Sequence, residues 1–150
     1  MTISALLFIV FLFGGAHSTI VSKCTNGPLP DDVQIENCDE EPCVFYINSE
    51  TSMTLKFKSP RKLVNIAPNA LANVMGINVT YPLGQDNACD GITNTKCPIE
   101  KGQQVEYTYG MTILPIFPEV SLNLEFSLQD KDNNNENVEC FKLDIQIKKP

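Results

Sequence analysis

The sequence predicts an all-β protein built as a sandwich of two facing sheets of antiparallel strands. Three observations carry this prediction. Apolar and polar residues alternate with a period of two over long stretches, glycine and proline separate these stretches, and no segment has convincing helical periodicity. The chain has 150 residues, of which 43% are hydrophobic, and this fits one globular domain.

The domain is expected to begin after a secretory signal peptide. Residues 6–13 form an uninterrupted apolar run that is followed by small residues ending at Ser18. The run falls well short of the roughly 20 residues that span a bilayer, and its pattern predicts cleavage before Thr19. We therefore expect residues 1–18 to be removed and residues 19–150 to form a secreted, extracellular protein without stable membrane insertion. The lysosomal lumen is an alternative destination.

Each strand is predicted from its own alternation. Short alternating segments cover residues 33–35, 53–58 and 76–81, and longer ones cover 104–113, 120–129 and 141–148. Strict alternation indicates a strand with one buried and one solvated face. Residues 65–74 do not alternate and are expected to hold a short helical turn at most. Six or seven short antiparallel strands over about 130 residues predict a sandwich of immunoglobulin-like architecture.

The alternation also divides the side chains between the two faces of each strand. Asn78 belongs to the one conventional glycosylation sequon, Asn78-Val79-Thr80, and falls on the outer face, where a glycan must lie. The pattern alone does not distinguish a packed interior from a hollow one lined by the same residues. The inner-face residues that are candidates to contact a ligand are Phe57, Ile77, Val79, Tyr109, Met111, Leu124 and Phe126.

All six cysteines lie in the predicted domain, and an even number in an oxidising compartment predicts three disulfides. Six cysteines allow about 15 pairings, and spacing alone does not choose among them. Local closure favours Cys38 with Cys43 and Cys89 with Cys97, which leaves Cys24 to pair with Cys140.

Composition excludes most catalytic chemistry. The only histidine, His17, lies in the predicted signal peptide, and disulfide pairing leaves no free thiol, so we expect no enzyme, no metal site and no cofactor. A net charge of −7 argues against nucleic acid as a partner. Residues 130–135 match the start of a calcium loop, but Asn135 and Phe141 occupy the positions that require Gly and Glu, so the segment is interpreted as a hairpin turn.

One segment, residues 113–118, is apolar on both faces and contains two prolines that cannot donate to a sheet. One interpretation is a buried crossover or the protection of an edge strand. The other is the rim of an apolar opening between the sheets. On physical grounds the two are about equally favoured.

Several motifs together resemble the ML-domain (MD-related lipid-recognition) family, which includes soluble Niemann-Pick type C cholesterol carriers and group-two mite allergens. They are Cys38-x4-Cys43, Cys89-x7-Cys97-Pro98-Ile99, Tyr107-x-Tyr109, Phe117-Pro118 and the run 124–130 before Cys140. The resemblance implies an immunoglobulin-like sandwich opened between its sheets to hold a lipid. It also implies the disulfides Cys24–Cys140, Cys38–Cys43 and Cys89–Cys97, and it places Tyr81, Ile113 and Phe117 at the mouth.

The leading prediction is a secreted, monomeric carrier for one lipid or other hydrophobic small molecule, namely a sterol, a fatty acid or an apolar signalling compound. Its partners would be this ligand and an acceptor or receptor protein at a membrane. The alternative is an extracellular recognition module that docks onto proteins through residues 113–118.

Overall fold

The computed structural model describes residue 15 and residues 17–150, so most of the predicted signal peptide lies outside the described residues. No helix in this described part is long and apolar enough to cross a membrane. The part contains one short 3-10 helix, η1 (Ala88–Gly91). Its strands are β1 (Ser22–Lys23), β2 (Asp32–Ile35), β3 (Cys43–Tyr46), β4 (Glu50–Lys58), β5 (Ile66–Val74), β6 (Ile77–Thr80), β7 (Gln104–Thr112), β8 (Val120–Asp130) and β9 (Glu136–Lys148).

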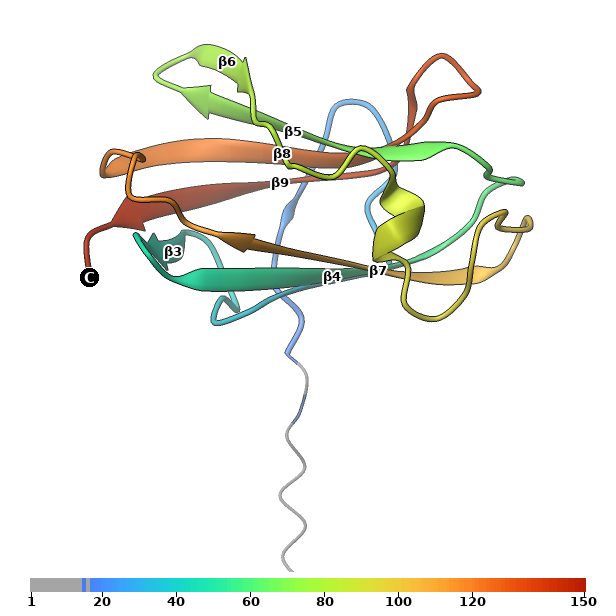
Figure 1. The fold of residues 1–150 in the computed structure, drawn as a ribbon, viewed down its shortest axis with the longest axis horizontal. Coiled ribbons are helices and arrows are strands. Elements are labelled where there is room, and N and C mark those ends of the chain that lie inside the picture. The colour runs from blue at the N-terminus through green and yellow to red at the C-terminus, as the bar shows by residue number, and fades with distance from the viewer. Residues whose placement is uncertain (1–14, 16) are drawn as a thin grey trace, which may run out of the picture.

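The strands form two facing sheets, which confirms the predicted all-β sandwich (Figure 1). The larger sheet has the order β1-β9-β8-β5-β6. β3 also pairs with β9, along residues 145–148, which follow the stretch of β9 that pairs with β1. The smaller sheet has the order β2-β4-β7. The structure has more strands than the six or seven predicted, and the β3–β9 pair is parallel. Both β1 and β3 are too short to alternate recognisably, and they are strands because the long β9 pairs with them.

Residues 65–74 form the nine-residue strand β5 and not a helical turn, so this expectation is wrong. The segment is rich in Ala and Asn and contains Pro68, which are poor strand residues by intrinsic preference. Its conformation is imposed by pairing with β8 along most of its length. Pro68 lies in the part of β5 that β6 does not reach, and an edge position tolerates a residue without an N–H.

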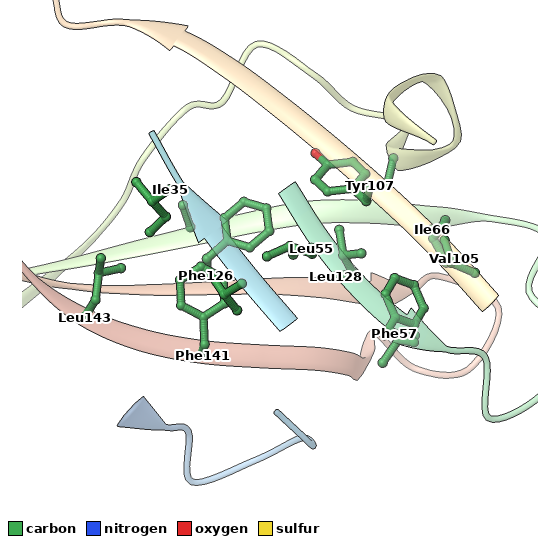
Figure 2. Packing of buried hydrophobic residues seen from close by; sticks show 14 of the residues in the cluster. Ile35, Leu55, Phe57, Ile66, Val105, Tyr107, Phe126, Leu128, Phe141 and Leu143 are labelled. Atoms are coloured by element: carbon green, nitrogen blue, oxygen red, sulfur yellow. The ribbon is translucent and has the colours of Figure 1, made fainter. Parts of the chain in front are cut away.

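One end of the sandwich is solidly filled by side chains from both sheets (Figure 2). Inner-face residues of β4 and β7 meet those of β5 and β8 there, and each is at most 2% exposed. They are Leu55, Phe57, Ile66, Val105, Tyr107 and Leu128. Burial of this many large apolar side chains, each contributing on the order of 1.5–3 kcal/mol, makes this end the main source of stability.

Three disulfides form among the six cysteines, in the pairing that the resemblance implies: Cys24–Cys140, Cys38–Cys43 and Cys89–Cys97. The first of them closes a sequence separation of 116 residues and fastens the segment after β1 to β9. Such a closure restricts the unfolded chain strongly.

The segment that follows Asp130 is the turn of the β8–β9 hairpin, as predicted. Asp130 is buried, and both of its carboxylate oxygens are occupied. Oδ2 accepts from Arg61 Nε at 2.8 Å, and Oδ1 accepts from the Asp132 amide at 3.1 Å. Asn134 and Asn135 adopt positive φ, which asparagine tolerates in turns.

Candidate ligand-binding cavity

The other end of the sandwich is hollow, and burial along three strands shows where the packing stops. On β4 the inner face passes from buried Leu55 to half-buried Met53, and on β7 from buried Tyr107 to half-buried Tyr109. On β8, in the opposite sheet, it passes from buried Phe126 to half-buried Leu124. Met53 pairs in register with Tyr109, as Leu55 does with Tyr107, so the change falls at one level of the smaller sheet.

A cavity of about 300 Å³ occupies this end, between the two sheets. Its lining contains no Asp, Glu, Lys, Arg or His side chain. The residues that surround it come from both sheets and from the segments after β6 and β7, and they include Phe45, Thr51, Met53, Ala70, Ala72, Val79, Tyr81, Leu83, Tyr109, Met111, Ile113, Phe117, Leu122, Leu124, Phe126, Phe141 and Ile147.

Small side chains on β5 explain why this end is not filled. Ala70 stands opposite Phe126 of β8, and Ala72 stands opposite Leu124, so each large residue faces a methyl group on the neighbouring strand. Figure 2 shows Phe126 beside Phe141, and the two ring centroids are 5.8 Å apart. The ring of Tyr109 packs on Phe126 from the facing sheet at 6.5 Å. These rings form the floor of the cavity, where the filled end begins.

Tyr81 and Phe117, the residues predicted to form the mouth, both line the cavity, and their ring centroids are 5.8 Å apart. The segment after β6 is held against β7 by two tyrosine hydroxyls, because Tyr109 donates to the Leu83 carbonyl and Tyr107 donates to the Gln85 side chain.

Residues 113–118, the predicted rim, are not a buried crossover, because four of the six are exposed. Ile113 is buried and tied to the turn before β4, where its N–H donates to the Ser49 carbonyl at 2.8 Å. Phe117 and Pro118 line the cavity. Ile116 points away from it and is 80% exposed.

The structure brings all but two of the ten predicted ligand-contacting residues to the cavity. Phe57 is on the inner face, as alternation predicts, but it is only 1% exposed and belongs to the filled end. Ile77 does not face the interior and is 67% exposed, so its predicted placement is wrong. Ile77 shares a face of β6 with Val79, which lines the cavity, but Ile77 lies at the hairpin end of this short, exposed edge strand, where the cavity no longer reaches. Asn78 is exposed there, and its glycosylation stays a prediction.

Sequence reasoning missed several residues that line the cavity, among them Ala70, Ala72 and Thr51. Ala70 and Ala72 were missed because their segment was not predicted to be a strand. Thr51 lies two and four residues before Met53 and Leu55 on the same face of β4, so extending the alternation by one step would have found it.

The titratable groups of the cavity stay neutral. Burial raises the pKa of Tyr81 above its ordinary value. The pKa of Tyr109 is raised by burial and, secondarily, by Tyr81. With no carboxylate, amine or imidazole in the lining, the cavity is an uncharged environment at every physiological pH.

One carboxylate behaves differently, but it lies outside the cavity lining. Glu139 on β9 is 4% exposed, and its Oε2 has no hydrogen-bond partner. Burial, and to a smaller degree the neighbouring Asp31, raise the pKa of Glu139 from 4.5 to about 8. Carboxylates are rarely buried without a partner, and Glu139 is such a case.

The fold is a two-sheet sandwich, cross-linked by disulfides, that is packed at one end and hollow and uncharged at the other. These features define a class of small proteins that enclose apolar molecules between β-sheets. Within that class, the chain belongs to the ML-domain family, whose family model matches residues 18–147.

Known proteins similar to this chain agree with that assignment. The NPC intracellular cholesterol transporter 2 homolog a of Drosophila melanogaster is 28% identical over 117 residues, which cover 77% of each chain. The mite group 2 allergen Lep d 2 of Lepidoglyphus destructor is 25% identical over 122 residues, covering 81% of this chain and 84% of the allergen. The crystal structure of a Niemann-Pick type C2 protein from Japanese carpenter ant has a TM-score of 0.77 at 25% identity and covers 86% of this chain and 99% of that one.

Proposed function

We propose that this protein is a non-enzymatic carrier that holds a single lipid or similar hydrophobic small molecule in the cavity between its sheets. The observation that carries the proposal is the uncharged lining of a cavity of about 300 Å³. An apolar molecule gains free energy by leaving water for such a site, whereas an empty apolar cavity costs the protein stability. The name of the Drosophila relative, a cholesterol transporter homolog, supports a lipid as the class of ligand.

The volume limits the size of the ligand. A cavity of about 150 Å³ accommodates benzene, with six carbons, so a cavity of twice that volume accommodates about a dozen carbons. At roughly 0.8 kcal/mol per buried methylene, twelve carbons contribute about 10 kcal/mol. After a cost of about 4 kcal/mol for lost freedom, the low end of the range for that cost, about 6 kcal/mol remains, which corresponds to a dissociation constant on the order of tens of micromolar. A single medium-length chain fits this volume without any opening of the sheets.

The same proposal covers where the protein acts. Three disulfides are typical of an oxidising compartment, which supports secretion of residues 19–150, to the extracellular space or the lysosomal lumen. Ligand release then requires the Tyr81–Phe117 contact to part, either spontaneously or on an acceptor protein. We propose that the carrier works as a monomer, because both sheets of a single chain contribute to one cavity.

A chain-length series tests the carrier proposal. Delipidated protein is titrated with straight-chain alcohols of increasing length by displacement of N-phenyl-1-naphthylamine, a probe that fluoresces in apolar sites. We expect affinity to rise with each methylene and to level off near about twelve carbons, where the cavity is full. Absence of binding at every length would overturn the proposal.

The exposed apolar side chains around the mouth favour a second candidate, a module that docks onto a protein. Met75 and Ile77 of the β5–β6 hairpin and Leu114 and Ile116 of the rim are all exposed. Figure 1 draws the hairpin and the segment after β7 at the same end of the molecule. Native mass spectrometry of the secreted protein separates the candidates: co-purifying lipid supports the carrier, and a ligand-free oligomer supports the docking module.

A further inference from the structure

The hairpin formed by β5 and β6 carries no charged side chain. Residues 66–85, which span the hairpin and the segment after it, contain no Asp, Glu, Lys or Arg, although these types make up 19% of the chain. Met75 at the tip and Ile77 and Val79 on β6 are all exposed. An uncharged segment with exposed apolar and β-branched residues tends to pair with other chains, and proteins commonly interrupt such a segment with a charge.

β6 lies at the edge of the larger sheet (Figure 1). Its four residues are all exposed, and in the described part of the chain their backbone pairs with β5 alone. The edges of the smaller sheet differ, because each is covered at least in part. The Thr19 N–H donates to the Val33 carbonyl of β2 at 2.6 Å. The Thr93 N–H donates to the Glu106 carbonyl of β7 at 2.9 Å. An uncovered edge presents unpaired N–H and C=O groups to a strand of another chain.

The sequon Asn78-Val79-Thr80 lies on this edge strand. Val79 lines the cavity, so the alternation along β6 places Asn78 and Thr80 on the opposite face, which is the outer face of the larger sheet. Asn78 Oδ1 accepts a hydrogen bond from Asn73 Nδ2 at 2.8 Å. Asn78 Nδ2, the atom to which an N-linked sugar is attached, makes no hydrogen bond to the described part of the chain. A glycan at Asn78 would therefore extend from the outer face and leave the cavity clear.

Attachment of a glycan replaces an N–H bond of Asn78 by a bond to carbon. Nδ2 forms a bond to C1 of an oligosaccharide carried by a lipid diphosphate, and the bond from C1 to the diphosphate oxygen breaks. The diphosphate leaves with the electron pair, and Nδ2 gives up one proton to a base of the transferase. The Thr80 hydroxyl completes the acceptor sequence that this reaction requires.

A glycan at this position blocks strand pairing by its bulk. A strand of another chain must come within about 4.7–4.9 Å of β6 to pair with it. Side chains that face each other across two paired strands are only about 4.5–5.5 Å apart. A bulky, hydrated oligosaccharide on Asn78 occupies the space in which the facing side chain would have to lie.

We propose that Asn78 carries an N-linked glycan and that this glycan protects the β6 edge, in place of the charged residue that the hairpin lacks. The inference goes beyond ligand binding and rests only on the secretion proposed for residues 19–150. It predicts that the glycosylated protein is a monomer and that two copies without the glycan pair through β6. Antiparallel pairing of β6 with β6 has twofold symmetry, so this association closes at a dimer.

The modification is tested on the full chain, expressed in cultured mammalian cells and collected from the medium. Peptide N-glycosidase removes an N-linked glycan and converts the asparagine to aspartate, which peptide mass spectrometry detects at residue 78. We expect this conversion in the natural sequence and in Thr80→Ser, which keeps the sequon, but not in Thr80→Ala. Secreted protein with an unmodified Asn78 would overturn the proposal. Absence of protein from the medium would refute the proposed secretion, and this inference with it.

The role of the glycan is tested by light scattering during size-exclusion chromatography at increasing protein concentration. Thr80→Ala and Asn78→Gln both remove the glycan, and we expect their measured mass to rise with concentration to about twofold that of one chain. The natural sequence and Thr80→Ser should stay monomeric. Asn78→Lys is the matched control, because it also lacks the glycan but places a charge on the same edge, and it should stay monomeric too.

The outcomes separate the site from its role. If Thr80→Ala and Asn78→Gln stay monomeric at every concentration, the glycan does not protect the edge. If Asn78→Lys associates as strongly as Asn78→Gln, the association does not use β6, and the proposed role is equally refuted. Because two different substitutions remove the glycan, misfolding of either one leaves the other to decide. Neither result bears on whether the cavity binds a ligand.

Discussion

Filling the cavity from within gives the most direct test that the hollow end serves a ligand. Ala72 of β5 lines the cavity opposite Leu124, and Ala72→Leu would add three carbons at this point. Scaled from a benzene-sized cavity, three carbons occupy about 75 Å³, roughly a quarter of the available volume. At roughly 0.8 kcal/mol per buried carbon, the variant gains as much as about 2.4 kcal/mol of unfolding free energy.

The same three carbons are lost to the ligand. In the variant, a ligand that would have filled the cavity can bury about three carbons fewer. This loss weakens its binding by about 2.4 kcal/mol, or roughly 50-fold. Stability and affinity therefore change in opposite directions. Urea denaturation measures the first quantity, and displacement of N-phenyl-1-naphthylamine by 1-dodecanol measures the second.

The control carries the same substitution on the other face of the same strand. Ala67 is an odd number of residues away from Ala72 and does not line the cavity, so Ala67→Leu should leave affinity unchanged. If Ala72→Leu lowers the unfolding free energy by about 1–3 kcal/mol, as overpacking does, and binding persists, the interior at this level is already filled. That result would refute the reasoning on which the carrier proposal depends.

Three further predictions address the mouth, the buried carboxylate and the long disulfide. Phe117→Asp should reduce 1-dodecanol affinity at least about tenfold with little loss of stability, because it places a charge at a half-exposed rim position. Ile116→Asp is the solvent-exposed control, and equal effects of the two would contradict the assigned mouth. The raised pKa of Glu139 means that the folded protein holds a proton that the unfolded chain releases, so this group's contribution to stability is full below about pH 4.5 and is lost as pH rises through about 8. Urea denaturation across that range should show a slope that Glu139→Gln reduces; an unchanged slope would show that Glu139 titrates normally. Replacing both Cys24 and Cys140 by Ala should lower the unfolding free energy by about 5 kcal/mol, since the bond closes a separation of 116 residues, and a loss below about 1 kcal/mol would contradict this role.

The sequence predicted the strands with long regular alternation and missed those without it. β7 and β8 alternate over most of their length and were predicted to within one residue at each end, whereas only residues 141–148 of β9 were predicted, because residues 138–141 are buried on both faces. β5 carries Ala on both faces and Asn69 and Asn73 on the outer one, and it is a strand because β8 pairs with it. Pairing of this kind is a tertiary property that no local pattern records.

The sequence predicted which strand faces carry the candidate site, but it did not predict where along the strands the cavity lies. Alternation identifies residues that share a face, yet it does not say how far along that face the cavity extends, which is why Ile77 was misplaced although Val79 on the same face lines the cavity. It also does not say at which level along the strand the packing stops. Phe57 and Met53 share a face of β4, but Phe57 packs into the filled end and Met53 lines the cavity.

The division of the sandwich into two ends explains how a small domain can keep a cavity. Packing that a protein gives up at one place must be offset elsewhere, because the net stability of a domain is only about 5–15 kcal/mol. Here the filled end, with Leu55, Phe57 and Leu128 fully buried, and the three disulfides provide that offset. The residues that leave the space empty, Ala70 and Ala72, lie on a strand whose hydrogen-bonded pairing does not depend on large side chains. Substitutions in the filled end should therefore change stability without changing ligand selectivity, whereas those in the hollow end should exchange one property for the other.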